Sequence, residues 1–132
     1  APNATIIGRY PGAIIANAKE SISQLIADGV DFNVIASIND AGSYGAIEAL
    51  EAAGIDPNSV IIVSVDAETR AQEYIRDGYY LRGSVAVART DFARASISLI
   101  VKQLAGATLP EVTILAPGEV VTAITLARQA SN

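Results

Sequence analysis

The sequence contains no histidine, cysteine, methionine or tryptophan, and only 5% of its residues are aromatic. Without histidine it lacks the usual general base and the commonest neutral metal ligand. Without cysteine it can form neither disulfides nor thiolate metal sites. These absences exclude a Ser-His-Asp triad, a Cys-His pair and most zinc hydrolase sites. We therefore expect a protein that is not an enzyme and that uses no metal and no cofactor.

Positive charge and long apolar runs are also scarce. Nine lysines and arginines stand against fourteen aspartates and glutamates, and no basic cluster suits nucleic acid as a partner. No stretch approaches the roughly 20 apolar residues that span a bilayer, and the opening residues APN do not read as a signal peptide. Because methionine is absent even from the first position, we expect a chain processed or excised from a longer protein.

What the sequence does contain is a regular order of aliphatic segments, in 132 residues of which 51% are hydrophobic. Four times a short apolar run precedes apolar residues at helical spacing, and this alternation predicts one α/β domain. We expect a three-layer sandwich with a mainly parallel sheet, right-handed crossovers and helices on both faces. The predicted strands are residues 5–8, 32–38, 60–65 and 83–88, and the helices end near Gly29, Gly54, Gly78 and Gly106.

Single segments support narrower expectations. Residues 60–65 (VIIVSV) form a β-branched run typical of a strand covered on both faces. Residues 113–115 read as a further strand, VVTAITLA near the end suits a strand or a helix, and the final RQASN is expected to be mobile. The helix predicted over residues 92–105 is expected to turn five residues inward, which are Phe92, Ile97, Ile100, Val101 and Leu104.

Polar residues gather where the predicted strands end. Ligands of open parallel sheets bind outside the carboxyl ends of the strands, and four loops lie there: residues 9–12, 37–42, 66–68 and 89–91. Carboxylates, amides and guanidinium groups at one rim suit a polyhydroxyl ligand, and Tyr10 could stack on an apolar sugar face. The polar residues of this rim are Arg9, Asn39, Asp40, Asp66, Arg89 and Asp91.

Helix capping is the competing explanation for several of these residues. Asp40, Asp66 and Asp91 stand where helix N-caps belong, and capping alone would account for them. A ligand role is favoured for Asn39, because its neighbour Asp40 could already cap the helix. Gly45 is better explained by close packing of the helix on the sheet than by a phosphate loop, since no phosphate-binding motif is present.

Three stretches together resemble a known family. ASINDAGSYGAIEALEAAGI, VIIVSVDAETRAQEYIRDGYYLRGSVAV and FARASISLIVKQLAG are similar in order and spacing to the C-terminal lobe of type I periplasmic sugar-binding proteins, the ribose-binding-protein-like solute receptors of ABC transporters. The resemblance runs from about residue 5 to residue 121. It implies that Asn39 and Asp66 hydrogen-bond a sugar. Ala13 stands where the family often has an aromatic residue, so Tyr10 could take that role.

The resemblance also implies what the chain does and what it works with. The expected site residues are Asn39, Asp66, Tyr10, Arg9 and Arg89, the last in place of an amide that often ends the fourth strand. Residues 1–132 would form a single lobe that provides one wall of a cleft for a monosaccharide or similar polyhydroxyl ligand. The expected partners are the remaining lobe and an ABC permease, and the expected location is periplasmic or extracellular.

The same resemblance implies that the first strand and helix of the lobe are missing. In the order 2-1-3-4-5 the missing strand would lie between residues 5–8 and residues 32–38. Either another polypeptide supplies it, from the rest of the receptor or by self-association of the chain, or residues 5–8 pair directly with residues 32–38. We favour the first.

Two other functions remain as alternatives. The effector lobe of a LacI-type transcriptional regulator shares the fold and the Asn-Asp motif. A flavodoxin-like or receiver-type enzyme domain would need a phosphoryl-accepting aspartate, and Asp66 is the only candidate.

Overall fold

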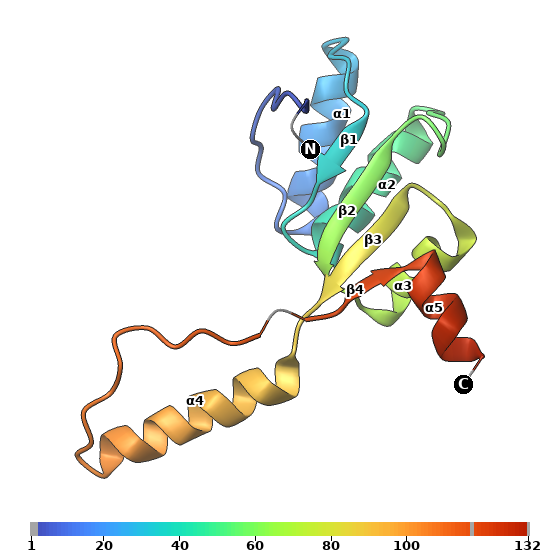
Figure 1. The fold of residues 1–132 in the computed structure, drawn as a ribbon. Helices are drawn as coiled ribbons and strands as arrows, with labels where there is room; N and C mark the ends of the chain where they lie inside the picture. The colour runs from blue at the N-terminus through green and yellow to red at the C-terminus, as the bar shows by residue number, and fades with distance from the viewer. Residues whose placement is uncertain (1–2, 117, 132) are drawn as a thin grey trace.

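The computed structural model describes residues 3–116 and 118–131, which form one four-stranded sheet and five helices (Figure 1). Strands β1, β2 and β3 are parallel neighbours, and β4 pairs antiparallel with β3. The predicted α/β class with a mainly parallel sheet is therefore confirmed. The elements are α1 (Ile15–Ala27), β1 (Val34–Ala36), α2 (Asp40–Ala52), β2 (Ile61–Asp66), α3 (Thr69–Asp77), β3 (Leu81–Ala86), α4 (Arg89–Leu104), β4 (Val120–Thr122) and α5 (Ala123–Ala130).

The core lies between the sheet and the helices α1, α2 and α3. Leu50 of α2, Ile62 of β2 and Ile75 of α3 are almost completely buried there. Helix α1 turns Ala18, Ile22 and Leu25 toward the core at helical spacing. A Cβ on Gly45 would lie 2.2 Å from the backbone oxygen of Ile15, so glycine lets α2 approach α1 closely. The predicted close packing is real, but the partner is α1 rather than the sheet.

The helix ends agree well with the glycine pattern. Gly29, Gly54, Gly78 and Gly106 all have positive φ angles, between 66° and 77°. Helix α3 ends at Asp77 with Gly78 as its left-handed C-cap, as predicted.

One face of the sheet carries exposed apolar side chains. Along β2, Ile62 and Ser64 are buried under the helices, while Ile61 and Val63 point the other way and are 43% and 40% exposed. The prediction that residues 60–65 are covered on both faces is therefore wrong for the described residues. Because strand side chains alternate between faces, we place Val34 and Val120 on this second face, where they too are exposed.

The N-terminal segment does not form the predicted strand. Residues 4–13 have no regular secondary structure, and among the described residues β1 pairs with β2 alone. The alternative in which residues 5–8 pair directly with residues 32–38 is therefore wrong. Strand β1 is left as an open edge, with Val34 more than half exposed.

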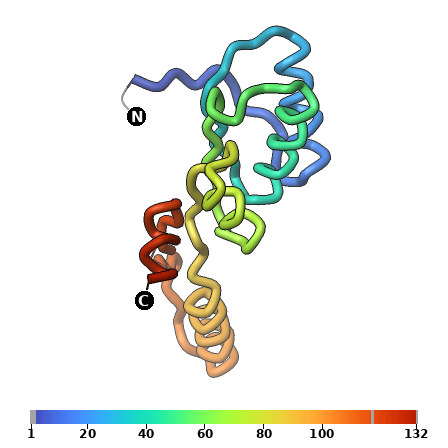
Figure 2. The backbone as a smooth tube through the Cα atoms, turned by 90° about the vertical axis from the view of Figure 1, so that its right-hand side faces the viewer, coloured from blue at the N-terminus to red at the C-terminus, as the bar shows by residue number. Residues whose placement is uncertain are grey.

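Helix α4 extends away from the sheet (Figures 1 and 2), and none of its residues is buried. The five residues predicted to turn inward are 58–83% exposed, so that prediction is wrong. The chain leaves β3 at Ala86 and returns at Glu119, where the Ala86 N–H donates to the Glu119 carbonyl at 2.8 Å. No helix within residues 3–116 and 118–131 combines the length and the apolar character that a membrane crossing requires.

The segment VVTAITLA, for which the sequence allowed a strand or a helix, forms one of each. Strand β4 is followed directly by α5, which begins with a capping box between Thr122 and Thr125. Residues 113–115 are not a strand. Arg128 to Ala130 belong to α5, so the prediction of a mobile C-terminal tail is wrong for these three residues. Asn132 lies outside the described residues.

Candidate functional site

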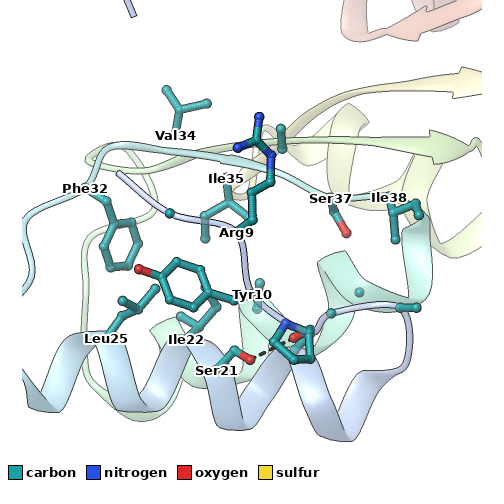
Figure 3. A pocket seen from close by; sticks show the side chains of 18 of the residues that line it. Arg9, Tyr10, Ser21, Ile22, Leu25, Phe32, Val34, Ile35, Ser37 and Ile38 are labelled. Atoms are coloured by element: carbon teal, nitrogen blue, oxygen red, sulfur yellow. Dashed lines mark hydrogen bonds between the residues drawn. The ribbon is translucent and has the colours of Figure 1, made fainter. Parts of the chain in front are cut away.

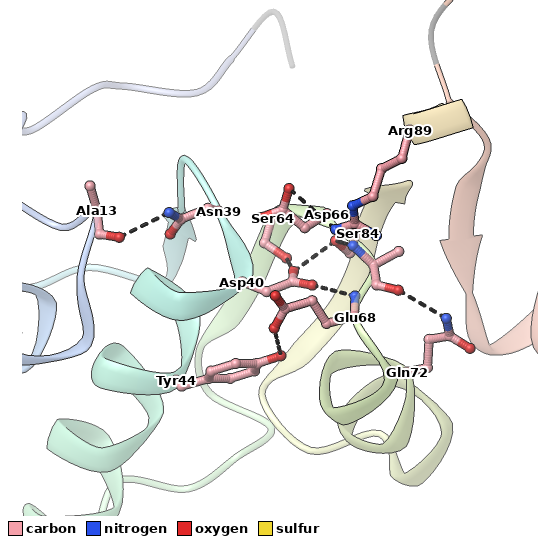
Figure 4. A network of polar contacts seen from close by, with 11 residues as sticks. Ala13, Asn39, Asp40, Tyr44, Ser64, Asp66, Glu68, Gln72, Ser84 and Arg89 are labelled. Carbon is pink, nitrogen blue, oxygen red and sulfur yellow. Dashed lines mark hydrogen bonds and ion pairs between the residues drawn. The ribbon is translucent and has the colours of Figure 1, made fainter. Parts of the chain in front are cut away.

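The carboxyl ends of β1, β2 and β3 meet at one edge of the sheet, as the sequence predicts for a parallel arrangement (Figure 4). The loops that leave this edge carry Asn39, Asp66 and Arg89, of which Asp66 and Arg89 are neighbours while the Asn39 side chain turns toward Ala13. Three of the five predicted site residues are therefore brought to one edge.

Asn39 is the N-cap of α2. Its Oδ1 accepts a hydrogen bond from the Gly42 N–H at 2.8 Å, and its Nδ2 donates to the Ala13 carbonyl at 2.9 Å. The expectation that Asp40 would cap this helix is thus wrong. A side-chain amide has two donors and two acceptor lone pairs. Asn39 therefore keeps one N–H and one lone pair for a ligand, while its other contacts tie the first rim loop to α2.

Asp40 is completely buried and binds three donors. One carboxylate oxygen, Oδ1, accepts from the Ser64 hydroxyl and from the Ser84 hydroxyl, the latter at 2.8 Å. The other, Oδ2, accepts from the Glu68 N–H at 2.7 Å. Sequence reasoning missed this role. The signal was a single serine in each of two otherwise apolar strands, in VIIVSV and GSVAVA.

Asp66 ends β2 in an unusual backbone conformation. Its φ is 111° and that of Ala67 is 51°, both in a region that non-glycine residues rarely adopt. The Asp66 carboxylate is partly exposed and lies 3.9 Å from a guanidinium nitrogen of Arg89, which is more exposed still. An ion pair this long and this exposed is weak, so both groups can turn to a polar ligand at low cost.

Tyr44 faces α3 rather than the rim. Its hydroxyl donates to a carboxylate oxygen of Glu68 at 3.1 Å, and the Arg70 guanidinium lies 4.4 Å from the centre of its ring. Burial, and then the hydrogen bond to Glu68, raise the pKa of Tyr44 above its ordinary value. Tyr44 therefore supports the loop between β2 and α3 from below.

Arg9 and Tyr10 line an apolar groove of about 470 Å³ that also reaches Ser37 and Gly42, on either side of Asn39 (Figure 3). The ring of Tyr10 points into this groove toward Leu25 and Phe32, and Arg9 extends on the side of Ile35. The groove separates the N-terminal segment from β1, at the position where the sequence predicts a missing strand. None of the hydrogen bonds found in the described part of the chain joins Arg9 or Tyr10 to Asn39, Asp66 or Arg89. The ligand role of Arg9 and Tyr10 therefore stays a prediction.

Metal binding finds no support at the rim. Among the described residues no three aspartates or glutamates gather in a way that could hold a metal ion.

Comparison with protein families and known proteins gives a consistent result. A family model described as "Periplasmic binding protein domain" matches residues 1–108. The fold is similar to the periplasmic binding protein component of the arabinose ABC transporter from Shewanella sp. ANA-3, bound to α- and β-L-arabinofuranose. The TM-score is 0.80 and the identity 26%, over 98% of this chain and 44% of that one. No match is found among curated proteins.

Two further structures are similar to the same extent. A Mycobacterium smegmatis protein in complex with β-D-fucofuranose has a TM-score of 0.80 and 26% identity, over 99% of this chain and 43% of that one. A galactofuranose-binding protein has a TM-score of 0.80 and 24% identity, over 99% of this chain and 45% of that one. The chain thus spans less than half the length of each of these proteins.

Proposed function

Because the chain belongs to the periplasmic binding protein domain family, we propose that it is one lobe of a two-lobe receptor that binds a monosaccharide or a similar polyhydroxyl ligand for an ABC transporter. The observation that carries the proposal is the position of Asn39, Asp66 and Arg89 at the carboxyl ends of the strands. Similar proteins bind L-arabinofuranose and β-D-fucofuranose, which supports a sugar as the ligand.

The three rim residues have complementary hydrogen-bonding capacity. The Asp66 carboxylate can accept from two hydroxyls, and Arg89 can donate from a planar fork. Asn39 offers one donor and one acceptor beyond its capping bonds. A second lobe would close over this wall, and a ligand that contacts both lobes would favour the closed state.

The uncovered apolar surfaces support a larger parent protein. The five apolar residues of α4 are 58–83% exposed, and the face of the sheet that carries Val34 and Ile61 is open as well. Soluble proteins rarely leave large contiguous apolar patches uncovered. We infer that residues 1–132 form most of one lobe and that the rest of the receptor covers these surfaces. Self-association of the isolated chain through the open edge of β1 is the alternative.

The remaining parts of the proposal follow from the family. The protein would act outside the cytoplasm, in the periplasm or on the cell exterior, deliver its ligand to an ABC permease and carry out no chemical reaction. The LacI-type alternative is not favoured, because the similar structures named above include the binding component of a transporter.

Calorimetry on the full-length parent protein tests the function, with L-arabinose, D-fucose, D-galactose and D-allose as ligands. We expect one of them to bind. Asp66→Ala and Asn39→Ala should each weaken that binding by about 1–3 kcal/mol, the usual cost of removing a buried hydrogen-bond partner.

Asp77→Ala is the matched control, because Asp77 is an exposed aspartate at the end of α3, at the opposite edge of the sheet from the rim. It should leave the affinity unchanged. Absence of binding to all four sugars, or wild-type affinity in both rim variants, would contradict the proposal. The isolated chain, with only one wall of the cleft, should bind no more tightly than about 1 mM, which corresponds to about −4 kcal/mol.

A further inference from the structure

The loop that carries Asp66 is held by contacts beneath it. The Ala67 N–H donates to the Ser84 hydroxyl at 2.9 Å, and the Glu68 N–H donates to Asp40 at 2.7 Å. Ser84 in turn donates to Asp40 at 2.8 Å. Two consecutive backbone amides of the loop are thus fixed by one buried carboxylate and one buried hydroxyl (Figure 4).

These contacts lie next to two residues with an unusual backbone conformation. Asp66 and Ala67 both have positive φ angles without being glycine. Such conformations persist only where the surrounding structure fixes them. The Gln72 side chain adds a third contact, since its amide donates to the Ala67 carbonyl at 2.9 Å. The conformation that presents the Asp66 carboxylate at the rim is therefore set by the protein itself, before any ligand arrives.

We propose that Asp40, acting together with Ser84, is a positioning residue that holds Asp66 in its ligand-binding orientation. The inference rests on the proposed function, and it assigns to the buried second residue of the Asn-Asp pair a role distinct from that of Asn39. Asn39 stands at the rim. Asp40 lies beneath it and reaches across from α2 to the loop after β2, so that one pair of neighbouring residues serves both sides of the site.

The two buried serines offer a matched pair for testing this. Ser64 and Ser84 are directly opposite each other on β2 and β3, and both donate to the same oxygen of Asp40. Only Ser84 also accepts from a loop amide. Removing either hydroxyl strips one donor from Asp40, but Ser84→Ala alone releases the Ala67 N–H.

The experiment measures sugar affinity in the full-length parent protein, by calorimetry with the four sugars named above. We expect Ser84→Ala to weaken binding about tenfold or more, and Asp40→Ala at least as much, whereas Ser64→Ala should change the affinity less than about threefold. In the background of Asp66→Ala, the further loss caused by Ser84→Ala should vanish, because the group that it positions is gone.

Hydrogen exchange of single amides in the ligand-free protein distinguishes positioning of the loop from a general loss of stability, because only positioning predicts different patterns for the two serine variants. The Ala67 amide should lose protection in Ser84→Ala, the Ala67 and Glu68 amides should both lose it in Asp40→Ala, and both should keep it in Ser64→Ala. This comparison uses the two serine variants, so it stands even if Asp40→Ala does not fold.

The outcomes distinguish a failure of the proposed function from a failure of the positioning role alone. If the wild-type protein binds none of the sugars, the proposed function fails and the positioning role fails with it. If the wild-type protein binds but Ser84→Ala and Ser64→Ala have equal affinities, or the loss persists undiminished in the Asp66→Ala background, only the positioning role is overturned. Unchanged exchange of the Ala67 amide in Ser84→Ala would overturn it as well.

Discussion

Helices α2 and α4 differ sharply in what surrounds them. Nine of the 13 residues of α2 are buried, against none of the 16 residues of α4. Both segments carry apolar residues at helical spacing. Leu50 of α2 is 0% exposed and Leu104 of α4 is 83% exposed. An apolar stripe at helical spacing therefore does not by itself tell whether the same chain covers that face of the helix.

The connections explain why the two helices behave differently. Helix α2 joins β1 to β2, which are parallel neighbours, so the chain must return along the sheet and α2 packs on it. Helix α4 joins β3 to β4, which are antiparallel neighbours. A short turn could join such strands, so nothing in the sheet requires α4 to lie against it.

The largest effect should come from truncating the same residue type in each helix. In the isolated chain, Leu50→Ala should lower the free energy of unfolding by about 2–5 kcal/mol, because it leaves a cavity in the core. Leu104→Ala should change it by less than about 0.5 kcal/mol, as expected for an exposed position. Urea unfolding followed by circular dichroism measures both. Equal losses would show that α4 is packed in solution and would remove the contrast.

The same pair measured in the full-length parent protein sharpens the comparison. If the rest of the receptor covers α4, Leu104→Ala should now cost about 1.5–3 kcal/mol, the value of a buried leucine side chain. Leu50→Ala should cost the same as before. A negligible cost of Leu104→Ala in both proteins would contradict the inference that the parent covers α4.

A smaller effect is expected at the N-termini of the two helices. Asn39 caps α2 with its side chain, whereas α4 has no side-chain cap. Asn39→Ala should therefore cost about 1 kcal/mol of stability in the ligand-free chain. Thr90→Ala, in the exposed first turn of α4, should cost almost nothing. Thermal unfolding of the two variants at one pH compares them, and a stability for Asn39→Ala equal to that of wild type would argue against the cap.

The smallest effect concerns pH and Tyr44, whose pKa is raised by burial and by its hydrogen bond to Glu68. The folded state favours the neutral phenol, so the stabilisation is fully present below the ordinary tyrosine pKa of 10.0. It is lost as pH rises above that value toward the raised pKa.

Tyr44→Phe tests this, since it removes the hydroxyl and keeps the ring. Wild type should be more stable than Tyr44→Phe by about 0.5–1.5 kcal/mol at pH 8, and by less at pH 11. Urea unfolding at the two pH values measures the difference. An advantage that grows between pH 8 and pH 11 would have the wrong sign for this account.

Local patterns predicted some parts of the molecule well. The ends of α3 and the left-handed glycines depend on residues close in sequence, and both were predicted. The position of the polar residues at one edge was predicted as well, because parallel strands bring their carboxyl ends to the same edge. The exposure of Ile61 and Val63 was not predicted, because the layer that covers a β-branched strand must come from elsewhere in the chain or from another chain. Asp40 was misread as a cap because its partners Ser64 and Ser84 are 24 and 44 residues away in sequence.

The point where the chain leaves β3 and rejoins at β4 has a topological consequence. A Cβ on Gly118 would lie 1.2 Å from the Ala86 carbonyl oxygen, and the Ala86 N–H donates to the Glu119 carbonyl. The chain therefore returns to the sheet beside the residue at which it leaves. In terms of connectivity, residues 87–118 are an insertion into what would otherwise be an ordinary β-hairpin. The whole excursion, α4 included, can vary in length or content through evolution without any strand of the sheet changing its neighbour.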